Sequence, residues 1–139
     1  MSDFKPLNWT AKPGVGYSVV RRGDGGMTLT FTDLSDTTLK DWHDFALAHL
    51  LDSDRLTRNL YDLRAVKDFP EHAIRLAVEV NSDPSTRNLR VAVVVASEKV
   101  RDAIMAVAAN VVGSGAAIKL FTDINEAEAW LSRSLDQIV

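Results

Sequence analysis

The chain has 139 residues, no cysteine, 46% hydrophobic and 25% charged residues, and a formal net charge of −3. This length and composition indicate one folded domain that needs neither a disulfide nor a thiolate-bound metal to fold. Its negative charge and scattered basic residues argue against binding to nucleic acid or to anionic membranes. No apolar run has the length of a signal peptide or a membrane span, so we expect a cytoplasmic protein.

The beginning of the chain predicts an arm followed by a β-hairpin. Residues 1–14 contain prolines and a glycine with little periodicity, which predicts an extended N-terminal arm before a single domain at residues 15–139. The segments 15–22 and 27–31 alternate between apolar and polar residues and are separated by Gly-Asp-Gly-Gly. Such a spacing with turn-forming residues predicts an antiparallel hairpin.

Helix-like and strand-like segments alternate through the rest of the chain. In order, they are a helix from the turn at Asp33 to Asp36 up to residues 52–54, a strand at 59–63, a helix from 68 to about 79, a strand at 89–96, a helix from 97 to 113, a strand at 117–121 and a helix from 123 to 135. Asp68, Ser97 and Asp123 are candidate helix N-caps, and Gly113 is a candidate C-cap. The run at 89–96 is almost continuously apolar and rich in β-branched residues, which predicts a central strand buried on both faces.

This order of elements, ββαβαβαβα, predicts an α/β fold. Strands that alternate with helices need crossover connections, so we expect a mostly parallel five-stranded sheet with helices covering it. The hairpin adds an antiparallel N-terminal strand at or near one edge of that sheet.

Signatures of catalysis and of metal binding are missing from the sequence. The three histidines form no HExxH motif, and two of them, His43 and His49, are six residues apart on different faces of a helix. Ser114 lies between glycines but follows a predicted helix C-terminus, where the nucleophile of a hydrolase does not belong. We therefore predict that the protein is not an enzyme and that it holds no metal and no cofactor.

Charged residues gather where the predicted strand at 59–63 ends and the next helix begins. They are Asp62, Arg64, Lys67, Asp68, Glu71 and His72. Open α/β sheets bind their ligands at the carboxyl ends of the strands, so this cluster is a candidate site. The alternative interpretation is that Asp68 and Glu71 cap a helix and that the other residues form a solvated loop.

Three stretches of the chain resemble a known family. They are Leu60-Tyr-Asp-Leu-Arg64 at the end of a strand, Leu89-Arg-Val-Ala-Val-Val-Val95, and Ile118-Lys-Leu-Phe-Thr-Asp123 followed by Glu126-Ala-Glu-Ala-Trp-Leu131. Together with the order of elements, they make the chain similar to the STAS-domain family, and most closely to its divergent SpoIIAA-like branch. The resemblance covers about residues 15–138 and implies the SpoIIAA-like fold.

The chain departs from this family at one functional position. The anti-anti-sigma members of the family imply a regulatory serine at the start of the helix after the Asp-Leu strand end, phosphorylated by a partner kinase. The matching stretch here is Asp68-Phe-Pro-Glu-His72, and no serine or threonine occurs between Asp62 and Glu79. The phosphorylation switch of the family is therefore absent.

Two hypotheses for the function follow. The first is a non-catalytic signalling or scaffold module of the STAS-like type that binds a protein partner at the charged edge. The residues expected to bind it are Asp33, Asp36, Arg64, Lys67, Asp68, Glu71 and His72. The second is a carrier or sensor for a small apolar or lipid-like ligand between sheet and helices, because some SpoIIAA-like relatives resemble the lipid-binding SEC14 fold and residues 103–117 are mostly small.

Overall fold

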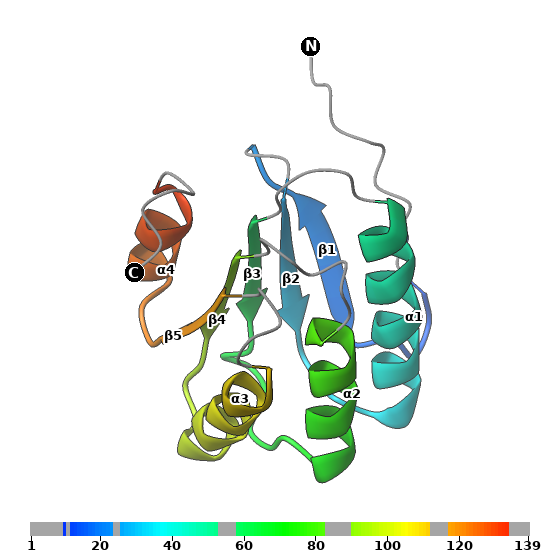
Figure 1. Ribbon diagram of the computed structural model, residues 1–139. Helices are drawn as coiled ribbons and strands as arrows, with labels where there is room; N and C mark the ends of the chain where they lie inside the picture. Colours follow the sequence, from blue (N-terminus) through cyan, green and yellow to red (C-terminus); the bar gives the residue numbers. More distant parts are fainter. Residues whose placement is uncertain are drawn as a thin grey trace.

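The computed structural model describes a layered α/β domain in which helices lie on both sides of one sheet (Figure 1). The described residues are 10, 12–23, 26–52, 58–82, 90–111 and 117–133. The elements are β1 (Tyr17–Arg21), β2 (Met27–Phe31), α1 (Asp36–Asp52), β3 (Arg58–Asp62), α2 (Glu71–Asn81), β4 (Arg90–Val94), α3 (Glu98–Asn110), β5 (Ala117–Phe121) and α4 (Ile124–Leu131). This order confirms the prediction from sequence.

The five strands form one sheet with the order β1-β2-β3-β4-β5. β1 pairs with β2 in an antiparallel register, and every other neighbouring pair is parallel. The predicted fold class is therefore confirmed. The prediction that the strand at 89–96 is central is wrong, because β3 occupies the middle of the sheet and β4 lies next to the edge.

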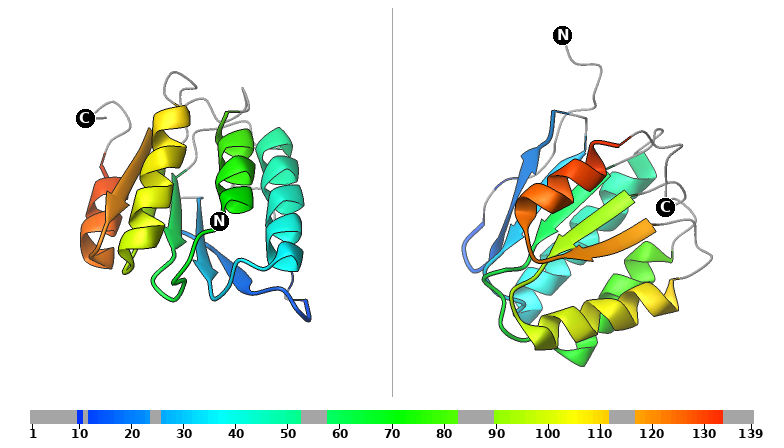
Figure 2. Two further views of the ribbon diagram at one scale, coloured as in Figure 1. Left: turned by 90° about the horizontal axis from the view of Figure 1, so that it is seen from below. Right: turned by 90° about the vertical axis from the view of Figure 1, so that its left-hand side faces the viewer.

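Helices cover the two faces of the sheet unequally (Figure 2). α1, α2 and α3 lie on one face, whereas α4 lies on the other. β4 is covered on both sides: Val91 and Val93 join the core beneath the three helices, and Ala92 and Val94 join a second core beneath α4. This double coverage explains why every residue of β4 is buried although the strand is not central.

Arg90, at the start of β4, is a buried charged residue that sequence analysis missed. Its side chain is 1% exposed, and its Nη1 donates hydrogen bonds to the carbonyl oxygens of Trp130 at 3.1 Å and Arg133 at 3.0 Å. The guanidinium also lies 5.2 Å from the centre of the Trp130 ring. A cation is favourable at the carboxyl end of a helix, so Arg90 fixes the end of α4 to the sheet.

Two of the three predicted helix N-caps are confirmed. The side chain of Ser97 accepts a hydrogen bond from the amide of Val100 at the start of α3, and that of Asp123 accepts one from Asn125 at the start of α4. The prediction for Asp68 is wrong, because Pro70 occupies the N-cap position of α2. A residue before proline is disfavoured in the helical conformation, so the helix cannot begin earlier. The predicted C-cap Gly113 lies outside the described residues.

Val93 tests the double coverage of β4. We expect Val93→Asp to abolish folding, because an unpaired carboxylate at a site that is 4% exposed costs several kcal/mol, a large part of the roughly 5–15 kcal/mol that stabilises a domain. Val20→Asp is the matched control, since Val20 on β1 is 63% exposed. Circular dichroism melting curves distinguish the two. Cooperative melting of Val93→Asp near the wild-type temperature would contradict the burial of β4.

Candidate functional site

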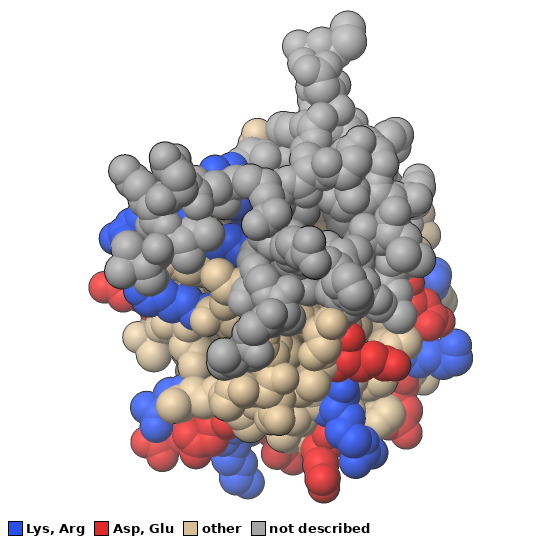
Figure 3. All heavy atoms as spheres, in the orientation of Figure 1, with Lys and Arg blue, Asp and Glu red and all other residues tan. Residues whose placement is uncertain are grey.

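The two predicted binding loops meet at one edge of the sheet. β2 and β3 are parallel neighbours whose carboxyl ends lie side by side, with Thr30 opposite Asp62. The turn at 33–36 follows β2 and the loop at 63–70 follows β3, so both lie at the lower end of the sheet in Figure 1. Acidic and basic side chains are mixed along this margin (Figure 3). The structure thus brings together segments that are about thirty residues apart in the sequence.

Asp33 holds the turn in front of α1. Its Oδ1 accepts hydrogen bonds from the Ser35 amide at 3.0 Å and from the Thr38 hydroxyl at 2.7 Å, which lower the pKa of the carboxyl group. Gly16 lies against this carboxylate so closely that a Cβ atom there would collide with it. Asp33 therefore has a structural role, whereas Asp36, in the first turn of α1, is exposed.

Arg64 forms a two-point ion pair with Asp62, the last residue of β3. Its Nε donates to Oδ1 at 2.9 Å and its Nη2 donates to Oδ2 at 2.8 Å. The Arg64 side-chain hydrogen bonds are the main reason why the pKa of Asp62 is lowered, and the Arg64 amide adds a third bond at 3.1 Å. This pair shapes the loop after β3 and neutralises much of the charge that sequence analysis had assigned to binding.

The other four predicted residues, Lys67, Asp68, Glu71 and His72, are exposed around the start of α2. Within the described part of the chain, the Lys67 and His72 side chains make no hydrogen bond or ion pair. Asp68 accepts a hydrogen bond from the adjacent amide of Phe69, at 2.9 Å. Glu71, whose side chain is 86% exposed, forms a weak ion pair with Arg75 one turn along α2, at 3.9 Å. Among the described residues, these four side chains therefore have few internal partners.

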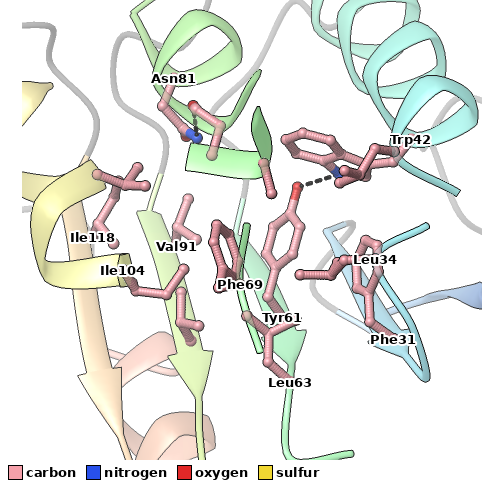
Figure 4. Close-up of a pocket in the computed structure, with 15 residues that line it drawn as sticks. Phe31, Leu34, Trp42, Tyr61, Leu63, Phe69, Asn81, Val91, Ile104 and Ile118 are labelled. Atoms are coloured by element: carbon pink, nitrogen blue, oxygen red, sulfur yellow. Dashed lines mark hydrogen bonds between the residues drawn. The ribbon is translucent and has the colours of Figure 1, made fainter. Parts of the chain in front are cut away.

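An apolar cavity of about 60 Å³ lies between the sheet and the three-helix layer. Its walls come from α1, α2, α3 and the strands beneath them (Figure 4). The lining residues are Phe31, Leu34, Leu39, Trp42, Tyr61, Leu63, Phe69, Ala73, Ala77, Asn81, Val91, Val93, Ile104, Val107 and Ile118. The periodicity of apolar residues in a sequence cannot distinguish a filled core from one that contains a void.

The hydroxyl of Tyr61 is the main polar group directed into this space. It points from β3 toward α1, where it accepts a hydrogen bond from Trp42 Nε1 at 3.1 Å (Figure 4). Burial raises the pKa of Tyr61 to about 12, so the hydroxyl keeps its proton at neutral pH. Asn81 borders the same cavity and donates through Nδ2 to the carbonyl of Ala77 at 2.8 Å. The cavity is suited to an apolar group with one hydrogen-bonding atom.

The described ranges contain no group of three metal-ligating side chains and no helix long and apolar enough to cross a membrane. A close pair of ionisable groups, His43 Nε2 and Glu79 Oε2 at 2.6 Å, joins α1 to α2. Both residues belong to helix surfaces outside the cavity lining, so the pair is a contact between helices.

Comparison with known proteins identifies the fold. No family model and no curated protein matches the chain. Among solved structures, it is similar to an uncharacterised protein of the DUF3478 family from Shewanella loihica PV-4, whose fold is described as SpoIIAA-like. The two share 17% identity with a TM-score of 0.60, over 88% of this chain and 99% of that one. The fold is SpoIIAA-like. The resemblance inferred from sequence is thus confirmed for the fold, and the SpoIIAA-like architecture carries both the charged edge and the cavity.

Alkaline titration tests the environment of Tyr61. The tyrosines of an unfolded chain ionise near pH 10, whereas we expect Tyr61 in the folded protein to ionise near pH 12. Stability should therefore fall as the pH rises from about 10 to 12, because the unfolded state loses its phenol proton first. Tyrosinate absorbance measures the ionisation, and Tyr61→Phe should reduce the absorbance change near pH 12 by the contribution of one tyrosine. Ionisation of Tyr61 near pH 10 would contradict its burial.

Proposed function

We propose that the protein is a non-catalytic binding module that recognises a protein partner at the carboxyl edge of its sheet. The contact residues form a patch, called here the carboxyl-edge surface. It consists of Asp36, Arg64, Lys67, Asp68, Glu71 and His72. The observation that supports this proposal is that Lys67, Asp68, Glu71 and His72 are exposed and have few partners within the described part of the chain.

The mixed charge of this surface favours recognition of a protein over recognition of a polyanion. Arg64 and Lys67 lie within a few residues of Asp68 and Glu71, so cationic and anionic groups are mixed over a short stretch of the chain. Such a pattern selects a partner with complementary mixed charges and gives specificity more than affinity. A solved protein similar to this chain has a SpoIIAA-like fold. This similarity supports the fold of the proposed module and carries no information about its partner.

Control of binding at this surface must differ from phosphorylation of the α2 start. Residues 63–78 contain no serine or threonine, so no hydroxyl for phosphoryl transfer lies in that segment.

A charge exchange tests the carboxyl-edge surface. Lys67→Glu combined with Glu71→Lys reverses the local pattern at constant net charge. The second change replaces the weak, exposed ion pair of Glu71 with Arg75 by a like-charge pair, which changes stability by only about 0.5 kcal/mol. Arg64 is left unchanged because replacing it with glutamate would place a second carboxylate against Asp62. The matched control exchanges Lys40 and Asp44, an exposed ion pair on α1 with side chains 80% and 63% exposed.

The measurement is quantitative pull-down from the source-cell extract, together with melting temperatures. We expect the Lys67/Glu71 exchange to lose proteins that the wild type and the Lys40/Asp44 exchange both recover, with all three melting alike. Equal recovery by all three proteins, or no recovery by the wild type, would contradict the proposal.

The cavity supports a second candidate function, the binding of a small apolar ligand. Its volume of about 60 Å³ accommodates only a few non-hydrogen atoms, so a larger ligand would have to displace side chains of α2 or α3. The ligand class that fits is an aliphatic or aromatic molecule with one acceptor for the Tyr61 hydroxyl. Cavities lined almost entirely by apolar side chains stay dry and accept such molecules.

Native mass spectrometry of gently purified protein tests this second candidate. We expect a retained mass in the wild type that Ala77→Leu eliminates, because the added side chain fills the cavity. Val20→Leu, on the exposed edge strand β1, is the control and should retain the mass. A wild-type spectrum that contains only the mass of the protein would exclude a stably bound ligand.

A further inference from the structure

The edge strand β5 has one side that no described strand pairs with. Among the described strands it pairs with β4 alone, and the carbonyl of Phe121 accepts a hydrogen bond from the amide of Val95 at 2.9 Å. Because backbone groups of successive residues in a strand point to opposite sides, the amides and carbonyls of Ile118 and Leu120 face away from β4. β5 lies at the outer margin of the sheet between α3 and α4 (Figure 2). Within the described part of the chain, no strand pairs with this side.

A groove of about 540 Å³ lies beside the carboxyl half of this strand. Its lining residues are Val95, Arg101, Lys119, Leu120, Phe121, Thr122, Glu126, Ala129, Trp130 and Arg133. They come from α3, β5 and α4 and from residues that directly follow β4, β5 and α4, so the groove contacts both faces of the sheet beside the edge. A groove beside an edge strand is a place where an extended peptide can add to the sheet.

The groove is locally cationic although the protein carries a net charge of −3. Arg101, Lys119 and Arg133 line it, whereas Glu126 is the one acidic residue among its lining residues in the described chain. Arg101 contacts the exposed carboxylate of Asp102 at 3.5 Å, a solvent-screened pair that leaves its side chain 53% exposed. Lys119 Nζ lies 5.7 Å from the centre of the Phe121 ring. Charge complementarity therefore favours an acidic occupant.

The same charges disfavour a second copy of this chain. Two β5 strands that paired side by side about their centres would bring their two Lys119 side chains onto adjacent strands. Like charges at neighbouring positions destabilise a sheet. A lysine on an edge strand is a common barrier to such self-association.

We propose that β5 binds an extended acidic segment of a protein partner as a sixth strand of the sheet. The backbone of the segment bonds to the outward amides and carbonyls of Ile118 and Leu120. Its carboxylates face Arg101, Lys119 and Arg133, and its apolar side chains cover the floor of the groove. This surface shares no residue with the carboxyl-edge surface and can be tested independently of it.

Two fluorescein-labelled peptides provide the probe, one alternating glutamate with valine and the other alternating lysine with valine. Fluorescence anisotropy should show that the wild type binds the glutamate peptide at least tenfold more tightly than the lysine peptide. Lys119→Glu should weaken binding of the glutamate peptide at least fivefold. Lys40→Glu, a change of the same kind on α1, should leave it unchanged, because Lys40 is remote from β5 in the fold.

Amide hydrogen exchange measured by NMR distinguishes strand addition from adhesion by charge alone. The glutamate peptide should slow exchange at Ile118 and Leu120, whose amides face outward. The proposal is overturned by no binding of the glutamate peptide, by equal binding to Lys119→Glu, or by binding that leaves these two amides unprotected. A peptide-free dimer that Lys119→Glu disrupts would also overturn it, in favour of self-pairing.

Discussion

β4 lies between two layers of helices, and all five of its residues are buried. Its alternate side chains enter two separate cores, one beneath α1, α2 and α3 and one beneath α4. A parallel strand of this kind cannot be stable with a face in water, so both layers must be present before β4 is buried. Its neighbours depend on the same burial: β3 is fixed in the middle of the sheet, and the loop after β3 is fixed at its carboxyl end.

Three described helices cover one face of the sheet and one covers the other, and this difference determines which parts of the sheet stay uncovered by helices. α4 alone covers its face, beneath β3, β4 and β5, and Arg90 and the Arg22–Glu128 ion pair at 2.6 Å hold it in place. β1 and β2 place polar residues such as Ser18 and Thr28 on that face, so they need no further helix. The carboxyl edge and the outer side of β5 are the surfaces at which we propose partner binding.

Local patterns in the sequence were sufficient to predict the backbone layout but not the relations between distant side chains. The apolar run at 89–96 and the caps Ser97 and Asp123 act through neighbouring residues, so they are visible in a single sequence. The position of Arg90 against the end of α4 joins residues about forty positions apart and has no local signal. The cavity beside Tyr61 likewise arises from seven elements that no periodicity relates to one another. Even the ion pair between Asp62 and Arg64, which are two residues apart in the sequence, depends on a loop geometry that only the structure shows.

Native-state hydrogen exchange tests the central claim of this account, that the double burial of β4 supports the rest of the fold. The amides of β4 and of the adjoining β3 should exchange only when the whole domain unfolds. The outward amides of β5 and those of the 63–70 loop should exchange by local opening, with a smaller free energy. Exchange of the β4 amides as fast as those of the edge strand β1 would contradict the account.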